Sequence, residues 1–163
     1  PMIKTLTLLL LFSCVCCTAH GQGGLPNSRV NVGVGIGMPY GGIGTKTILG
    51  PRNSGLMIGL GIFPGGIVGY EIGAQLGIQS FYLNAGYGIS SVYQVNDEPI
   101  ESVTCGNFML GYMINLNPKK TVFLDLSLGH TIGAPTVDVG PFRENQGGVT
   151  FAFGVGWRLA IKD

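Results

Sequence analysis

Most of the chain alternates between large apolar residues and small or polar residues with a period of two. The clearest stretch is the last, in which Val149, Phe151 and Phe153 alternate with small residues. Because successive side chains of a β-strand point to opposite faces, each such stretch predicts a strand with one apolar face. The expected strands cover residues 29–38, 43–49, 55–62, 68–76, 81–90, 107–116, 122–129 and 149–161, of which 43–49 has the weakest pattern.

The second face of these strands decides the fold class. It consists mostly of Gly, Ser, Asn and Ala, whereas the outer face of a soluble sandwich is charged and solvated. Small residues suit the interior of a narrow closed barrel, with the apolar face turned to lipid. The sequence therefore predicts an all-β fold, an eight-stranded antiparallel up-and-down transmembrane β-barrel. A soluble β-sandwich or lipocalin-like barrel is the alternative.

The amino-acid composition further narrows the classes of protein to which the chain can belong. Only 10% of the 163 residues are charged, against roughly 25% in soluble domains. The 29 glycines follow no Gly-X-Y period, and 45% hydrophobic residues exclude a disordered chain. The net charge of +1 comes from scattered Lys and Arg residues, so nucleic acid is not an expected partner. One domain is expected.

The first 21 residues have the pattern of a secretory signal peptide. Lys4 precedes an apolar run over residues 6–15, and small residues extend to Gly21. We expect cleavage before Gln22, with His20 as the alternative first residue, which leaves a barrel over residues 22–163. The apolar run is shorter than the ~20 residues of a spanning helix, although an uncleaved anchor remains an alternative. Export then predicts location in a bacterial outer membrane.

The cysteines bear on anchoring and on metal binding. Cys14, Cys16 and Cys17 lie in the leader, so a lipoprotein is a further alternative, but Phe12 stands where a lipoprotein signal has a small residue. Removal of the leader leaves Cys105 alone. The mature chain is then expected to contain no disulfide and no multi-cysteine metal site.

Connection lengths give an independent test of the barrel. The second, fourth and sixth connections, at 50–54, 77–78 and 117–120, are short and rich in turn residues. The fifth and seventh, at 96–102 and 133–146, are the longest, while the first and third, at 39–42 and 64–66, are modest. This pattern places both termini and the short turns in the periplasm. An extracellular partner is expected at the long loops, 94–102 and 131–147.

Two segments carry a family resemblance. Residues 154–159 (GVGWRL) resemble the terminal assembly signal of outer-membrane proteins, and residues 35–44 (GIGMPYGGIG) are similar to the opening hairpin of small outer-membrane barrels of Bacteroidetes-like bacteria. The whole mature chain resembles small barrels of the OmpA/OmpX type. That resemblance implies contact with outer-membrane lipid and insertion by the barrel assembly machinery. Leu159 replaces the usual terminal aromatic residue.

Catalytic and ligand-binding motifs are few. The Gly-rich segment 33–37 lies inside a strand, whereas a dinucleotide fingerprint opens a helix, and no nucleophile elbow or phosphate loop occurs. A membrane hydrolase would use Asp125, Ser127 and His130. The alternation, however, points His130 to the other face of the strand from Asp125 and Ser127. The loop carboxylates have no regular Ca²⁺-ligand spacing; they are Asp97, Glu98 and Glu101. We therefore expect no enzyme activity, cofactor or metal.

The strand positions that alternate toward the inside of the barrel predict a cluster of charged residues in the lumen. Its members are Arg29, Glu71, Asp125 and Arg158. Two acids and two bases balance, and pairing is expected because an unpaired buried ion is destabilising. Eight strands leave room only for side chains, so the lumen is expected to be closed. The predicted role is structural or surface-interacting; the alternative is a secreted or surface-anchored soluble β-domain that binds an apolar ligand.

Overall fold

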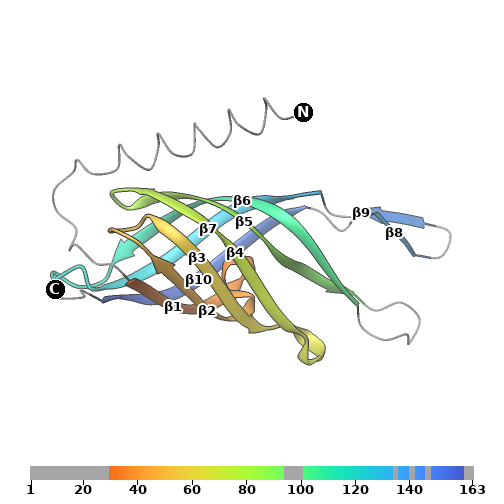
Figure 1. The fold of residues 1–163 in the computed structure, drawn as a ribbon, viewed down its shortest axis with the longest axis horizontal. Coiled ribbons are helices and arrows are strands. Elements are labelled where there is room, and N and C mark those ends of the chain that lie inside the picture. Colours follow the sequence, from red (N-terminus) through yellow and green to blue (C-terminus); the bar gives the residue numbers. More distant parts are fainter. Residues whose placement is uncertain (1–29, 94–100, 134–135, 140–141, 146–147, 160–163) are drawn as a thin grey trace.

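Eight antiparallel strands close into a single barrel, as the alternation predicts (Figure 1). The computed structural model describes residues 30–93, 101–133, 136–139, 142–145 and 148–159. Neighbouring strands pair in the order β1-β10-β7-β6-β5-β4-β3-β2, and β2 returns to β1. The barrel strands are β1 (Val30–Gly37), β2 (Gly42–Leu49), β3 (Gly55–Ile62), β4 (Val68–Ile78), β5 (Phe81–Tyr93), β6 (Glu101–Asn115), β7 (Val122–Ile132) and β10 (Val149–Leu159).

The two ends of the barrel differ. The short connections β2–β3, β4–β5 and β6–β7 lie at one end, where β1 also begins and β10 ends; we call it the turn end. The other, or loop, end carries the 3-10 turns η1 (Met38–Tyr40) and η2 (Pro64–Gly66) and a separate hairpin of β8 (Thr136–Val139) and β9 (Phe142–Asn145). This hairpin lies within the long seventh connection and was not predicted. No helix in the described segments is long and apolar enough to span a membrane.

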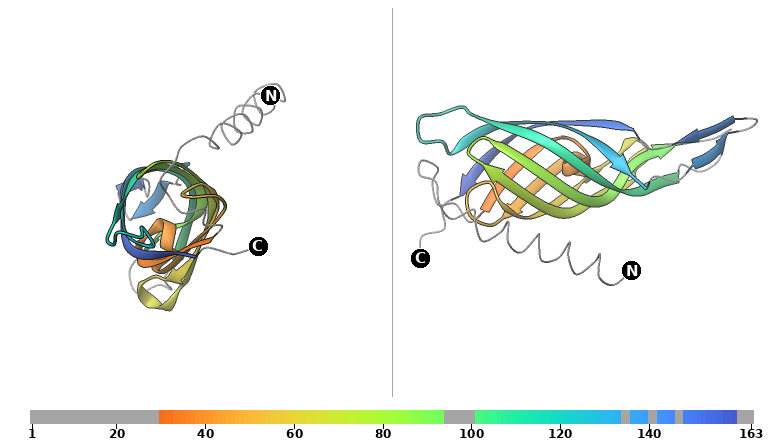
Figure 2. Two further views of the ribbon diagram at one scale, coloured as in Figure 1. Left: turned by 90° about the vertical axis from the view of Figure 1, so that its left-hand side faces the viewer. Right: turned by 90° about the horizontal axis from the view of Figure 1, so that it is seen from above.

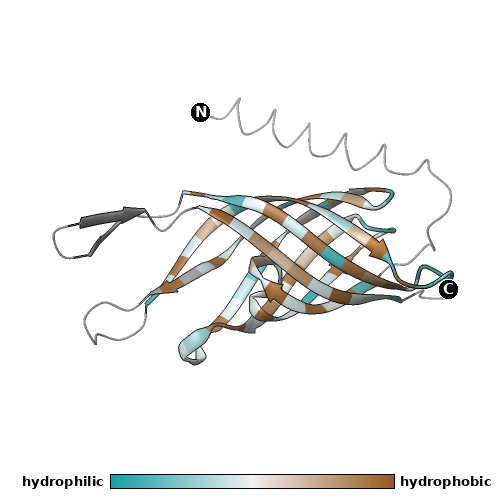
Figure 3. Ribbon diagram, turned by 180° about the vertical axis from the view of Figure 1, so that it is seen from behind, coloured by the Kyte–Doolittle hydropathy of each residue, from teal (hydrophilic) through white to brown (hydrophobic). Residues whose placement is uncertain are grey.

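Apolar side chains cover the outside of the barrel and polar ones line the inside. Leu60, Leu110 and Phe153 are exposed, whereas Asn31, Glu71 and Asp125 are buried. Figure 3 shows the alternation of apolar and polar positions along the strands. The core thus lies within the barrel, where Tyr82, Met113 and Phe123 belong to one cluster and Tyr40 and Met109 to another. The predicted inward and outward positions are confirmed over the central part of each barrel strand except β2, whose faces the sequence does not assign.

Two of the described positions depart from the predicted parity, and the first is Met38, which is expected to face outward at the end of the first strand but is buried in η1. The second is Ile89, which is expected to face outward but is buried. The register between β5 and β6 shifts between Ile89 and Ser91, and an extra residue in one strand reverses the parity beyond it. Both strands also extend further toward the loop end than predicted, to Tyr93 and from Glu101.

The first connection folds into the barrel instead of forming an external loop. Met38, Pro39 and Tyr40 form η1, and all three are buried. This turn packs against β1, β2, β3, β4, β5 and β10, and the view along the barrel shows it inside the ring of strands (Figure 2). Gly41 makes the sharp return possible, since its φ of 65° is unfavourable for residues with a side chain. The connection at 39–42 was predicted, but its fold into the lumen was not.

Candidate functional site

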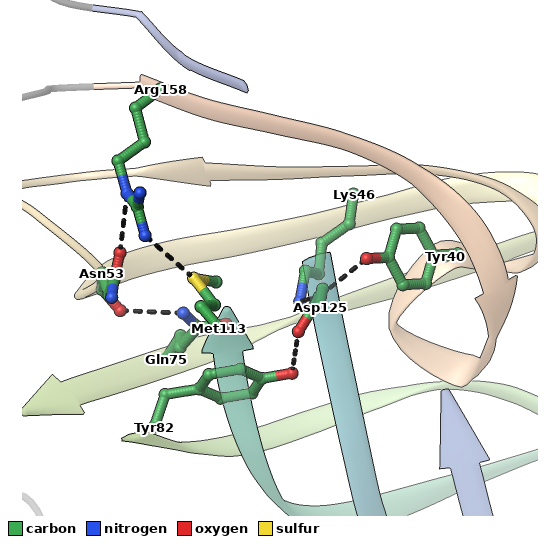
Figure 4. Close-up of polar contacts among 8 residues, drawn as sticks. All are labelled: Tyr40, Lys46, Asn53, Gln75, Tyr82, Met113, Asp125 and Arg158. Atoms are coloured by element: carbon green, nitrogen blue, oxygen red, sulfur yellow. Dashed lines mark hydrogen bonds and ion pairs between the residues drawn. The ribbon is translucent and has the colours of Figure 1, made fainter. Parts of the chain in front are cut away.

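Asp125 of β7 is the centre of a hydrogen-bonded network across the lumen (Figure 4). Its Oδ2 accepts a hydrogen bond of 2.6 Å from the Tyr40 hydroxyl and forms an ion pair with Lys46. Its Oδ1 accepts a hydrogen bond from the Tyr82 hydroxyl. Because the donors come from η1, β2 and β5, this one carboxylate connects the inward-folded turn to distant parts of the wall.

Lys46 is held by aromatic faces as well as by charge. The alternation of β2 turns Lys46 inward, where its side chain is 1% exposed. Its ammonium lies 5.2 Å from the centroid of the Tyr40 ring and 4.9 Å from that of Tyr82. Such cation–π contacts stabilise a desolvated ammonium. The ion pair and the two rings thus form one buried cluster inside the lumen.

Glycines on the inner wall make room for these large side chains. A Cβ atom at Gly35 would lie 2.9 Å from the Tyr40 ring, and one at Gly154 would collide with the Tyr40 hydroxyl. In the same way, a Cβ at Gly111 would collide with the Tyr82 ring. The glycine-rich inner face is thus the complement of a few bulky residues, as expected for a small packed barrel.

Arg158 organises a second network at the turn end. Its Nη1 donates to Asn115 Oδ1 at 2.7 Å and to the Lys120 carbonyl oxygen at 2.5 Å, and its Nε donates to Asn53 Oδ1 at 3.3 Å. Asn53 Nδ2 in turn donates to the Gln79 carbonyl oxygen at 2.8 Å. The guanidinium therefore links all three short turns through neutral acceptors.

The predicted charge cluster is distributed along the lumen. Glu71, Asp125 and Arg158 are all buried inside the barrel, while Arg29 lies outside the described residues. Asp125 pairs with Lys46, which was not among the predicted charges, and Glu71 lies apart on β4. Sequence analysis missed Lys46 because the apolar pattern of residues 43–49 is weak, with Thr45 and Thr47 on the outward face. If the alternation had been continued through this segment, it would have placed Lys46 inside the barrel.

Tyr40 is the other residue that sequence reasoning missed. It lies in a connection, where a period of two has no meaning. The only signal is that a Met-Pro-Tyr segment, residues 38–40, interrupts a glycine-rich stretch.

The remaining candidate residues do not converge. Ser127 is buried in the lumen and His130 is exposed, as the parity predicts, so the two do not share a face. Glu101 is exposed at the start of β6, and Asp97 and Glu98 lie outside the described residues. No three His, Cys, Asp or Glu side chains of the described segments gather as a metal site. The segment 33–37 lies within β1, and Cys105 is a buried free thiol.

The two networks connect different parts of the barrel wall. The Asp125 network joins η1, β2, β5 and β7 across the lumen, and the Arg158 network joins the three short turns at the turn end. No family model, curated protein or solved structure matches the chain. The function must therefore be inferred from this geometry.

Proposed function

We propose that the chain is a bacterial outer-membrane β-barrel with a closed lumen and a structural or surface-interaction role, without catalysis. The main support for this proposal is that charged side chains lie inside the barrel and apolar side chains outside, the inverse of the distribution in a soluble protein. Lys46, Glu71 and Asp125 are at most 1% exposed, whereas Leu110 is 62% and Phe151 70% exposed. A barrel in water would expose its charged groups and bury such residues, while a lipid-facing barrel does the opposite.

Aromatic residues on the outer surface support the same proposal. Phe81, Tyr112 and Trp157 are exposed toward the turn end, and Tyr70 and Tyr87 toward the loop end. The rings of Phe81 and Tyr112 pack edge to face, 4.6 Å apart. Two such bands are typical of membrane–water interfaces. On this proposal the outer wall contacts outer-membrane lipid, and the assembly machinery inserts the barrel after export through a cleaved signal peptide.

A soluble barrel that binds an apolar ligand is the second candidate, and its interior chemistry disfavours it. Such a barrel encloses an apolar cavity, whereas Tyr40, Tyr82 and the Lys46–Asp125 pair fill this lumen. A groove in the described residues lies instead on the outer wall, lined by Tyr112, Leu128 and Phe153 among others. That position suits contact with lipid chains.

Fractionation tests the proposal directly. The full chain, expressed with its leader in a Gram-negative host, is expected in the outer-membrane fraction and to need detergent for extraction. Unboiled samples should migrate differently from boiled ones on gels, because a closed barrel resists the detergent until heated. Recovery in the soluble periplasmic fraction would contradict the proposal and favour the ligand-binding alternative.

The packed lumen predicts that the protein forms no channel. Purified protein refolded into planar bilayers should show no large, steady single-channel current, since the Asp125 and Arg158 networks obstruct the lumen at two levels. A refolded porin under the same conditions is the positive control. Reproducible conductance steps from the wild type would favour a transport role.

A further inference from the structure

One patch of the inner wall holds nearly all the buried polar atoms that lack a partner. In the described residues, every such side-chain atom except Ser127 Oγ belongs to one of four residues, Glu71, Gln75, Asn84 or Asn107. Glu71, Gln75 and Asn84 are 0% exposed and Asn107 is 1% exposed. Buried polar groups almost always have partners, so a cluster of exceptions indicates an additional bound species.

The strand register places these four side chains side by side. Gln75 of β4 pairs with Asn84 of β5, and Gly86 of β5 pairs with Asn107 of β6. The Glu71 carboxylate lies over Gly86, where a Cβ atom would collide with it. The carboxylate therefore extends from β4 across β5 toward Asn107. Gln75 Nε2 donates to the Asn53 carbonyl oxygen at 2.8 Å, which leaves its side-chain oxygen without a partner, and the four residues form one patch of the inner wall on three adjacent strands.

Among the described residues, no cation forms an ion pair with Glu71. The Asn107 amide is close enough to act on the Glu71 carboxylate as a donor, although the two do not reach hydrogen-bond geometry, and Lys46 acts on the carboxylate through space. The Lys46 ammonium, however, is bound to Asp125. The hydrogen bonds of Arg158 go to Asn53, Asn115, the Met113 sulfur and a carbonyl oxygen at the turn end. A buried carboxylate in this situation needs a cation or a proton.

The unpartnered atoms have the composition of a hard-cation site. Both carboxylate oxygens of Glu71 and the side-chain carbonyl oxygens of Gln75, Asn84 and Asn107 are without donors. Ca²⁺ takes six to eight oxygen ligands in flexible geometry, including carboxamide oxygens and water, whereas Mg²⁺ requires a near-ideal octahedron. We propose that these four side chains bind one Ca²⁺ ion, with water completing its coordination. With a single carboxylate, its dissociation constant is expected at about 0.1–1 mM, the range of weak extracellular sites.

Direct binding to the folded full-length protein is the first test. Protein refolded in detergent is freed of metal with EDTA and dialysed against radioactive Ca²⁺ up to about ten times the expected dissociation constant. One ion per chain is expected at saturation. The unfolding temperature should rise by a few degrees with Ca²⁺, but not with K⁺ at equal ionic strength. Absence of this ion, or an equal effect of K⁺, would overturn the proposal whatever the variants do.

Variants then locate the ion. Glu71→Gln keeps the shape of the side chain and should abolish both the bound ion and the thermal shift. Glu101→Gln makes the same change on an exposed carboxylate at the end of β6 and should leave both unchanged. If Glu101→Gln alone removes the ion, the site is in the fifth connection and not in the lumen.

The variant Asn107→Asp distinguishes between two ways in which Glu71 could be satisfied, by a bound cation or by a proton or water molecule. A second carboxylate beside Glu71 should tighten Ca²⁺ binding at least about tenfold, because affinity follows the number of charged ligands. The same variant should be less stable than wild type in EDTA, since two buried like charges repel each other. Destabilisation that Ca²⁺ does not relieve would show that Glu71 is satisfied by a proton or water, and would overturn the proposal. These outcomes do not depend on the membrane in which the barrel resides.

Discussion

Asp125→Asn is expected to destabilise the folded barrel by about 3–5 kcal/mol, the usual effect of leaving a buried ion without its partner. The substitution preserves the shape of the side chain and an oxygen that can accept from a tyrosine hydroxyl. It removes the charge that balances Lys46, whose side chain is 1% exposed and lies against the rings of Tyr40 and Tyr82, and it replaces one of the two acceptor oxygens by an amide donor. The measurement is reversible urea unfolding of protein refolded into lipid bilayers, followed by tryptophan fluorescence from Trp157.

The double variant Asp125→Asn with Lys46→Met tests whether the loss comes from the unpaired charge. Removal of both members of a buried pair is often nearly neutral, so the double variant should recover most of the stability lost in Asp125→Asn. Glu101 is exposed, and contacts of exposed charges contribute about 0–1 kcal/mol, so Glu101→Gln should change stability by no more than about 1 kcal/mol. Losses that simply add in the double variant would mean that Lys46 and Asp125 are not coupled.

The barrel could be predicted from the sequence because one local rule determines most of it. The alternation fixes which side chains of β7 and β10 face inward, and a closed barrel leaves each strand only two neighbours. Asp125 and Arg158 were thus placed in the lumen without knowledge of any contact. The rule fails where the backbone departs from regular strand geometry, as at Ile89 beside the bulge in β5.

The partners of the charged residues could not be predicted in the same way. Lys46 and Asp125 are 79 positions apart in the sequence, and they meet across the lumen because β2 and β7 lie on different parts of its wall. Tyr40 reaches the same carboxylate only because η1 folds inward, into space left by Gly35 and Gly154. Parity gives the direction of a side chain, but pairing also depends on the packing of the whole interior.

Phe153→Arg is expected to destabilise the protein by about 2–4 kcal/mol in a bilayer if the outer wall faces lipid. Phe153 lies in the middle of β10, 48% exposed, with Ile36 and Leu126 as its partners on the adjacent strands. Val149→Arg is the matched control, because Val149 lies on the same face at the loop end of β10 and is 75% exposed. Near the membrane interface an arginine should destabilise by only about 0–1 kcal/mol.

The difference between these two variants distinguishes lipid from water around the barrel. In water, arginine on an exposed face changes stability by no more than about 0.5 kcal/mol at either position. In a bilayer, only the arginine near the middle of the strand must bring its charge into hydrocarbon. Urea unfolding in bilayers, and again in a detergent that lets water reach the side chain, should show a large gap between the variants in the first medium and a smaller one in the second. Equal, small effects in bilayers would mean that the apolar face does not contact lipid, and the soluble alternative would then be the better account of the fold.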